Sequence, residues 1–157
     1  MAVQYPAFTA KIINFLLAVL GLTGVVMKTR ILVVDDERDF THMLKLQLER
    51  FGYFEVLEEN DETLAVATAR EFGPDLVLLD LMMPNREGTE VAAAMHSDAL
   101  LRDTPILFLT ALVAEADAPG GGSYCSGGRT FLPKSLPTAS LIECIRKTLR
   151  ERRAVAV

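Results

Sequence analysis

Three short runs of uninterrupted apolar residues constrain the fold of this chain more than any other feature of its sequence. The runs Ile31–Val34, Leu76–Leu79 and Ile106–Leu109 lack the alternation of apolar and polar residues that marks a strand with one face in water. Continuous apolar runs of this length are typical of strands that are buried on both faces. The sequence therefore predicts parallel strands enclosed between two layers of helices.

Helical and strand-like patterns alternate along the chain after residue 28. The helical segments carry apolar residues at a period near 3.6, and glycine or proline follows several of them. We predict helices over 37–51, 61–72, 88–101 and 137–152, further strands over 54–57 and 130–132, at most a short helix over 111–116, and irregular structure over the glycine-rich stretch 118–128. Five βα units joined by right-handed crossovers predict an α/β fold, a doubly wound five-stranded parallel sheet with helices on both faces.

Length and charge limit the functions that need to be considered. With 157 residues the chain is long enough for one domain with a substantial core and too short for two ordinary domains. Its formal net charge of −5 argues weakly against nucleic acid as the main partner, because phosphate binding requires a basic face. We interpret the basic cluster within 146–153 as the solvated face of a last helix. Cys125 and Cys144 show neither metal-ligand nor disulfide spacing, so a reduced, intracellular protein is expected.

The first 27 residues form a separate segment. Residues 12–27 are almost all apolar, yet as a helix they span only about 24 Å, less than the ~30 Å hydrocarbon core of a membrane. Three explanations remain open: a mis-assigned start with Met27 as the natural beginning, a short membrane anchor or interfacial helix, and a signal peptide without a recognisable cleavage site. We divide the chain into an N-terminal extension (1–27), one folded domain (28–152) and a tail (153–157).

Side chains suited to phosphate chemistry follow the predicted strands. Asp35 and Asp36 come after the first strand, Asp80 after the third, Thr110 after the fourth and Lys134 after the fifth. Because the carboxyl ends of parallel strands meet at one edge of a sheet, we expect these side chains to lie together. Clustered carboxylates favour a hard cation such as Mg²⁺, a lysine supplies a compact charge for phosphate, and a carboxylate can attack phosphorus. Each residue alone is more often a cap, turn or surface residue, and it is their order and placement together that predict a site.

These residues resemble the motifs of the receiver domain of two-component response regulators. Residues 33–37 (VVDDE) are similar to the acidic start of that family, residues 80–84 (DLMMP) with Gly88 to its phosphoacceptor loop, and residues 109–111 (LTA) to its switch threonine. The likeness covers about residues 28–152. It implies the flavodoxin-like strand order 2-1-3-4-5.

The resemblance also implies how the acidic residues act. Asp80 would be the aspartate that accepts a phosphoryl group. Asp36 and Asp80 would hold Mg²⁺ together with the backbone carbonyl of Met82, and Asp35 would act through a bound water. The implied cofactor is therefore Mg²⁺.

Three further positions match functional positions of the family, and a fourth departs from it. Lys134 would pair with the phosphoryl group, while Thr110 and Phe131 take the places of the switch residues. The family usually has proline after the lysine, often with a cis bond, and this chain has Ser135. A non-proline cis bond costs about 2.5–4 kcal/mol, so either this bond is trans and the loop differs, or strain is stored there.

The function that the resemblance implies is a single-domain phosphorylation switch. A histidine kinase or phosphorelay partner would phosphorylate Asp80, and the face formed by the fourth helix region, the fifth strand and the fifth helix would then change its affinity for a downstream protein. A hydrolase would need a second acid/base carboxylate near Asp80, where Leu81 and Met82 stand. We therefore expect no enzyme beyond self-phosphorylation from small donors and autodephosphorylation.

The remaining expectations concern alternatives, partners and location. A degenerate receiver that serves as a phosphorylation-independent docking module is the alternative function. No DNA-binding segment follows the last predicted helix in this sequence, so direct contact with nucleic acid is not expected. We expect a cytoplasmic location, with membrane association only through residues 12–27.

Overall fold

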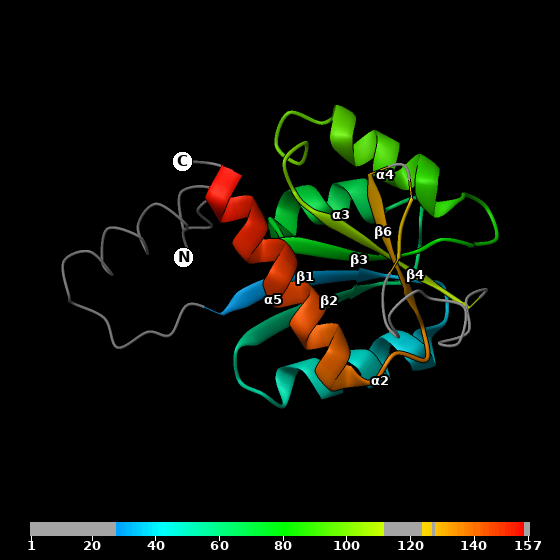
Figure 1. Cartoon of the computed structure of the whole chain (residues 1–157). Helices are drawn as coiled ribbons and strands as arrows, with labels where there is room; N and C mark the ends of the chain where they lie inside the picture. Colours follow the sequence, from blue (N-terminus) through cyan, green and yellow to red (C-terminus); the bar gives the residue numbers. More distant parts are fainter. Residues whose placement is uncertain (1–27, 112–123, 127, 156–157) are drawn as a thin grey trace, which may run out of the picture.

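A central sheet with helices on both faces forms the described part of the chain, which in this computed structural model comprises residues 28–111, 124–126 and 128–155 (Figure 1). In chain order its elements are β1 (Thr29–Val34), α2 (Arg38–Glu49), β2 (Phe54–Glu59), α3 (Ala65–Phe72), β3 (Leu76–Asp80), α4 (Gly88–Ser97), β4 (Ile106–Thr110), β5 (Tyr124–Ser126), β6 (Arg129–Pro133) and α5 (Thr138–Val155).

The five long strands are parallel and lie in the order β2-β1-β3-β4-β6, which confirms the predicted order and fold class. A sixth strand, β5, pairs antiparallel with β6 at the edge of the sheet. The prediction of irregular structure throughout 118–128 was therefore wrong for Tyr124–Ser126. Ser126 pairs with Arg129, and Gly128 before it has a φ of 74°, in the left-handed region that tight hairpins require.

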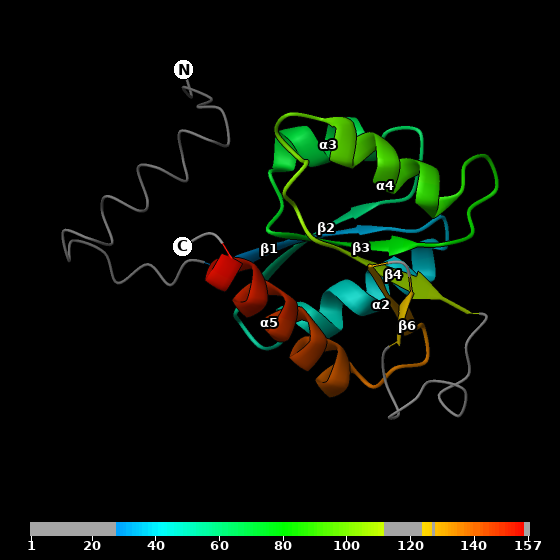
Figure 2. The same cartoon turned by 45° about the horizontal axis from the view of Figure 1, so that its top comes forward.

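Alternation along each buried strand divides the core into two layers. Ile31 and Val33 contact the layer that includes residues of α2 and α5, whereas Leu32 and Val34 contact the layer that includes residues of α3 and α4. Figure 2 shows these two pairs of helices on opposite faces of the sheet. A strand with apolar neighbours on both faces has no position for water, which explains the uninterrupted apolar runs.

Two helices are shorter by four residues at one end than the sequence pattern predicts, and an aspartate accounts for each of these differences. Helix α3 begins at Ala65 rather than at residue 61, because the Asp61 carboxylate accepts hydrogen bonds from the backbone and hydroxyl of Thr63 and forms a turn. Helix α4 ends at Ser97 rather than at residue 101, since Asp98 is extended and accepts a hydrogen bond from Leu100 N.

Several predictions fall on parts of the chain that the structure does not describe. They concern the apolar stretch 12–27, the short helix within 112–116 and the glycine-rich residues 118–123. Among the helices that can be described, none combines the length and the apolar character needed to cross a membrane.

Candidate functional site

The predicted strand-end residues converge at the carboxyl edge of the sheet. Asp35 and Asp36 directly follow β1, and Asp80 is the last residue of β3. Because β1 and β3 are neighbours, one carboxylate oxygen from each of these three residues lies within 4.8 Å of the others. The sequence prediction that the carboxylates gather in one place is confirmed.

Lys134 joins this acidic cluster from the loop after β6. Its Nζ lies 2.7 Å from Asp35 Oδ2, 2.7 Å from Glu37 Oε1 and 3.5 Å from Asp80 Oδ2. The backbone helps to position it, because Lys134 N donates a hydrogen bond to the carbonyl oxygen of Thr110, at 2.9 Å. The ammonium group is thus the centre of a set of three carboxylates.

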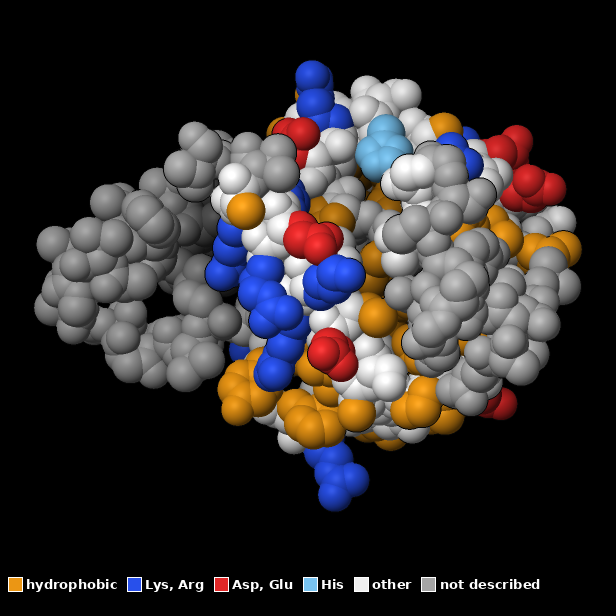
Figure 3. Space-filling view, viewed as in Figure 1, with side chains coloured by type: hydrophobic (Ala, Val, Ile, Leu, Met, Phe, Trp, Pro, Cys, Tyr) orange, Lys and Arg blue, Asp and Glu red, His pale blue; other side chains and the backbone are white. Residues whose placement is uncertain are grey.

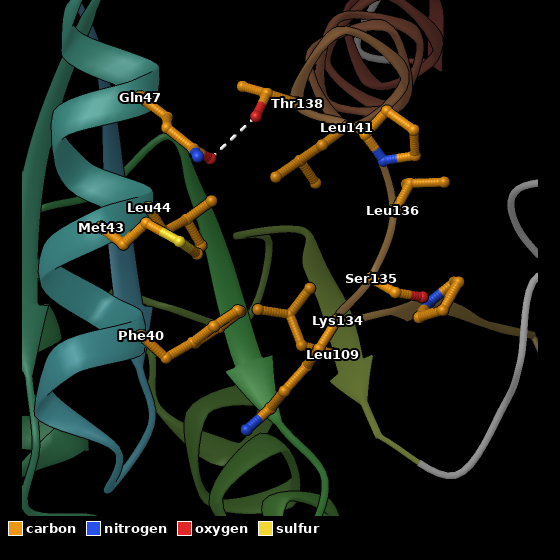
Figure 4. A pocket seen from close by; sticks show the side chains of 12 residues that line it. Phe40, Met43, Leu44, Gln47, Leu109, Lys134, Ser135, Leu136, Thr138 and Leu141 are labelled. Atoms are coloured by element: carbon orange, nitrogen blue, oxygen red, sulfur yellow. Dashed lines mark hydrogen bonds between the residues drawn. The ribbon is translucent and has the colours of Figure 1, made fainter.

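A hollow beside this lysine separates α2 from the loop that leads into α5 (Figure 4). The Lys134 side chain passes the ring of Phe40, with Nζ 4.8 Å from the ring centroid. At the other end, the Thr138 hydroxyl donates a hydrogen bond of 2.8 Å to Gln47 Oε1. The first helix and the last helix of the described domain therefore meet beside the acidic cluster.

Burial makes the acidic cluster electrostatically unfavourable without a cation. The Asp35 side chain is inaccessible to solvent and Asp80 is 4% exposed, while Asp36 is exposed. Burial, together with the negative charge of Asp35, raises the pKa of Asp80 to about 6, and Lys134 only partly opposes this. Burial likewise raises the pKa of Asp35, although Lys134 and the backbone of Glu37 act in the opposite direction.

The same contacts keep Lys134 charged. Burial by itself would lower the pKa of this ammonium group, but hydrogen bonds to Asp35 and Glu37, together with attraction to both aspartates, outweigh burial and raise it. Lys134 is therefore a permanent positive charge at neutral pH. It offsets part of the charge of the aspartates and leaves the remainder for another cation.

The donor set matches what a magnesium ion requires. Mg²⁺ prefers oxygen ligands, commonly one or two carboxylates with water and phosphate oxygens completing the shell. Asp35 Oδ2 is buried 2.7 Å from Lys134 Nζ, and Asp35 offers a carboxylate oxygen within 4.8 Å of those of Asp36 and Asp80. With Asp36 exposed and Asp80 nearly buried, the carboxylate cluster opens toward solvent on one side.

The loop after Asp80 is held against the strand end by its backbone. Met82 N lies 3.4 Å from Asp80 Oδ1, and Gly88 N donates a hydrogen bond to the carbonyl oxygen of Leu81. A β-carbon at Gly88 would overlap the backbone oxygen of Asp80, which explains why glycine stands at this position. Glu62, from the loop after β2, accepts a hydrogen bond from Asn85 N and fixes the middle of the loop.

The two predicted switch residues lie on β4 and β6, which are paired. Thr110 ends β4 and is 2% exposed, and the Phe131 ring stacks on Phe108 with 5.2 Å between centroids. Phe131 packs against the core layer shared with α3 and α4. A movement of Phe131 would therefore change the surface next to β5, the edge strand.

The peptide bond between Lys134 and Ser135 is trans, as are all peptide bonds of the described residues. Of the two isomers that the sequence left open, the structure has the trans bond. Leu136 N donates a hydrogen bond to the carbonyl oxygen of Pro133, and the resulting turn leads directly into α5. Ser135 therefore stands at the usual proline position, with a trans peptide bond before it and within the turn that leads to α5.

Sequence reasoning missed two residues that support the cluster. Glu37 was read only as part of an acidic run, yet it contacts Lys134 across 97 positions of sequence. Asn60, at the end of β2, donates hydrogen bonds to the backbone oxygen of Asp35 and to the Thr41 hydroxyl. The acidic run was a signal for the first residue, whereas nothing local distinguishes Asn60 from an ordinary turn residue.

Comparison with known proteins agrees with this geometry. Residues 31–146 match the profile of the response regulator receiver domain. One relative is the DNA-binding response regulator MtrA of Mycobacterium tuberculosis, which is 36% identical over 79% of this chain and 52% of MtrA. Another is the phosphate regulon transcriptional regulatory protein PhoB of Klebsiella pneumoniae, which is 34% identical over 83% of this chain and 56% of PhoB. The chain thus spans about half the length of these curated relatives.

A solved structure gives the same result for the fold. The CheY-like receiver domain protein from Methanospirillum hungatei superposes with a TM-score of 0.65 over 82% of this chain and 98% of that protein, at 24% sequence identity. The family profile covers most of the chain, and the acidic pocket of Asp35, Asp36 and Asp80 lies beside Lys134. The chain belongs to the response regulator receiver domain family.

Proposed function

We propose that this protein is a phosphorylation switch in which Asp80 accepts a phosphoryl group from a histidine kinase or a phosphorelay partner. The observation that carries the proposal is the position of the Asp80 carboxylate, which ends a buried strand between two other aspartates and a charged lysine. Burying a carboxylate destabilises the folded state, because the ionised form loses its hydration. The same carboxylate is well placed as a nucleophile, since its neighbours can neutralise an incoming phosphoryl group.

The transfer step uses residues of this chain in distinct roles. An oxygen of the ionised Asp80 carboxylate attacks the phosphorus of a phosphohistidine, the new P–O bond forms as the P–N bond breaks, and the imidazole leaves with the bonding electron pair. Mg²⁺ bound by Asp36, Asp80 and the Met82 carbonyl, with Asp35 acting through a water, would neutralise charge on the phosphoryl oxygens. Lys134 supplies a second positive charge 3.5 Å from the Asp80 carboxylate.

The response would pass through the strands next to Asp80. Thr110, at the end of the neighbouring strand, can donate a hydrogen bond to a phosphoryl oxygen, and Phe131 would repack when Thr110 moves. The surface that changes would be formed by the fourth helix region, the last parallel strand (β6) and α5. We propose that this surface controls the binding of a downstream protein and that the switch works in the cytoplasm.

The experiment that tests the proposal measures phosphorylation of the intact chain. Incubation with acetyl phosphate and Mg²⁺, followed by intact mass spectrometry, should show the gain of one hydrolytically labile phosphoryl group. The gain should be absent without Mg²⁺ and absent in Asp80→Asn. Asp36→Asn should reduce it strongly, while Asp39→Asn, an exposed aspartate on α2, serves as the matched control.

The alternative function, a phosphorylation-independent docking module, makes the opposite prediction. A folded chain that binds Mg²⁺ but gains no phosphoryl group from acetyl phosphate or from any phosphohistidine donor would contradict the switch. A gain that persists in Asp80→Asn would place the phosphoryl group on another residue. Either result would require the role of Asp80 to be abandoned.

A further inference from the structure

The loop that follows β2 contacts both segments that carry the carboxylates of the acidic site. Asn60 Nδ2 donates a hydrogen bond of 2.7 Å to the carbonyl oxygen of Asp35, directly after β1. Two residues further on, Glu62 Oε1 accepts a hydrogen bond of 2.8 Å from Asn85 N, in the loop between β3 and α4. The loop after β2, which we call the bridging loop (residues 60–64), therefore connects the two sides of the carboxylate cluster without contributing a carboxylate to it.

Glu62 is a buried acid between two exposed neighbours. It is 3% exposed, whereas Asp61 and Thr63 beside it are exposed. Burying an ionised carboxylate is costly unless hydrogen bonds replace its hydration. Here the N–H groups of Glu62 itself and of Asn85 donate to the carboxylate, and they hold the pKa of Glu62 below its ordinary value despite burial. The carboxylate is therefore ionised at neutral pH and acts as a hydrogen-bond acceptor for the neighbouring loop.

Hydrogen bonds fix the bridging loop to the two helices beside it. Asp61 N donates a hydrogen bond of 2.9 Å to Glu59 Oε1 at the end of β2, and the other oxygen of that carboxylate accepts one from the Thr68 hydroxyl on α3. On the other side, Asn60 Nδ2 lies 3.0 Å from the Thr41 hydroxyl on α2, to which it also donates. The bridging loop is therefore a stationary support for the segments that it contacts.

The loop between β3 and α4 is held at three points. A backbone hydrogen bond of 2.9 Å from Gly88 N to the carbonyl oxygen of Leu81 closes the loop. Met83 is buried in the core layer shared with α3 and α4. The third point is the hydrogen bond from Asn85 N to Glu62. This bond fixes the loop relative to the bridging loop, and through it relative to the chain that follows β1.

We propose that Asn60 and Glu62 are positioning residues for magnesium, because they fix the distance between the carboxylates after β1 and the loop after β3. The inference rests on the magnesium site of the proposed function, in which Asp36, Asp80 and the Met82 carbonyl are the ligands. Mg²⁺ demands near-ideal octahedral geometry and therefore tolerates little misplacement of its ligands. Replacing residues that orient metal ligands from outside the coordination shell typically weakens metal affinity by about 10–100-fold.

An effect of charge alone has to be distinguished from positioning. Figure 3 shows a group of acidic side chains at the side of the molecule that carries the loop before α4, away from the basic side chains on α5. Loss of any one negative charge there would weaken the attraction of the site for a cation to a small extent. Glu62→Gln removes the charge but keeps an oxygen that can accept the hydrogen bond from Asn85 N. Asp39→Asn, an exposed change in the first turn of α2, is the matched control for loss of one charge.

The test measures the affinity of the full chain for Mg²⁺ by isothermal titration calorimetry, without a phosphoryl donor. Glu62→Ala and Asn60→Ala should each weaken the affinity by about tenfold or more, because the two sides of the site are no longer held at a fixed distance. Glu62→Gln and Asp39→Asn should each stay within about threefold of the natural chain, because a screened charge contributes little. The double variant Asn60→Ala with Glu62→Ala should bind little more weakly than the more affected single variant, since both residues act through one bridge.

Urea denaturation in metal-free buffer separates positioning from stability. Lower stability with an unchanged affinity for Mg²⁺ would show that Glu62 has a merely structural role and would overturn the proposal. Equal losses of affinity in Glu62→Ala, Glu62→Gln and Asp39→Asn would overturn it as well, because charge alone would then explain them. If Glu62→Ala does not fold, Asn60→Ala tests the same bridge from its other end.

The same titrations distinguish this proposal from the proposed switch. A natural chain without measurable affinity for Mg²⁺ would overturn both the positioning role and the magnesium site. A natural chain that binds Mg²⁺ but gains no phosphoryl group on Asp80 would contradict the switch, and the affinities of the variants would still decide the roles of Asn60 and Glu62.

Discussion

At the scale of single residues, Asp80 is held where its own ionised form is disfavoured. Its folded pKa of about 6 exceeds the ordinary value of 3.8, because the carboxylate is buried beside Asp35. The folded state therefore binds a proton more tightly than the unfolded state does. Ionisation destabilises the fold, and this penalty is absent below pH 4 and complete above pH 6.

Removing that charge should therefore stabilise the protein at neutral pH. In metal-free buffer, we expect Asp80→Asn to raise the free energy of unfolding by about 1–3 kcal/mol at pH 7 and by much less at pH 4. Urea denaturation of both proteins at several pH values measures the difference. If the difference in free energy of unfolding between the two proteins were the same at pH 4 and pH 7, ionisation of Asp80 would not destabilise the fold. Adding Mg²⁺ should stabilise the natural protein more than the variant.

The two ion pairs that Lys134 forms with Asp35 and Glu37 should contribute different free energies to stability, because the two carboxylates differ in exposure. Asp35 is inaccessible to solvent, whereas the Glu37 side chain is 63% exposed, yet both lie 2.7 Å from Lys134 Nζ. Lys134→Ala leaves a buried carboxylate without its counter-charge and should cost about 3 kcal/mol. Glu37→Gln removes a solvent-screened pair and should cost less than about 1 kcal/mol. Chemical denaturation of both variants tests this ranking, and equal losses would contradict it.

At the scale of elements, the start of α4 shows how a backbone contact overrides helix propensity. Alanine is about 1 kcal/mol better than glycine inside a helix, so propensity alone predicts that Gly88→Ala stabilises α4. In the structure a β-carbon at this position would collide with the backbone oxygen of Asp80, which a side-chain rearrangement cannot relieve. Strand β3 and helix α4 are therefore packed closely enough to require glycine.

We accordingly expect Gly88→Ala to lower the free energy of unfolding by about 1–3 kcal/mol and to slow phosphorylation of Asp80. Thermal unfolding and intact mass after incubation with acetyl phosphate measure the two effects. Ser97→Ala, an exposed change at the other end of α4, is the control and should change stability by less than about 0.5 kcal/mol. A stabilising effect of Gly88→Ala would show that the loop can move away from the helix.

The boundaries of the elements show where sequence patterns are reliable. Strand positions were predicted within one or two residues, because short runs rich in apolar residues and bounded by turn residues mark the strands. The helix ends at Ala65 and Ser97 were missed, since Asp61 and Asp98 bond to nearby backbone and stop the helix before the apolar pattern does. The β5–β6 hairpin was missed because three residues are too few to show a period, although the Gly127-Gly128 pair is a known turn signal.

At the scale of the whole molecule, the acidic site and the starts of β1 and β2 lie at opposite edges of one sheet. The carboxylates follow the carboxyl ends of β1 and β3, whereas Tyr53 immediately precedes β2 and its carbonyl bonds to the first residue of β1. Changes confined to one edge should therefore leave the other edge intact, because charges separated by more than about 10 Å are largely screened at ordinary salt concentration.

This separation predicts that charges at the far end of α5 can be changed without loss of phosphorylation. Arg150→Glu with Arg153→Glu should leave the rate of phosphorylation of Asp80 within about twofold of that of the natural chain. Intact mass spectrometry after incubation with acetyl phosphate and Mg²⁺ measures this rate. Loss of phosphorylation in the arginine variant would indicate that α5 transmits a change from one edge to the other.

The sequence by itself determined the fold class, the identity of the strand-end residues and the family, because burial on both faces and the placement of polar residues after strands are local patterns. It did not determine the isomer of the peptide bond before Ser135 or the residue that Glu37 contacts. It also did not determine where α3 begins and α4 ends, because Asp61 and Asp98 set those positions. Only the tertiary structure decided that Lys134 lies among three carboxylates, that Asp80 has a raised pKa, and that Arg146 lies over Tyr53. The physical reason is distance: these contacts join residues far apart in sequence, and their energies depend on burial that exists only once the helices have packed onto the sheet.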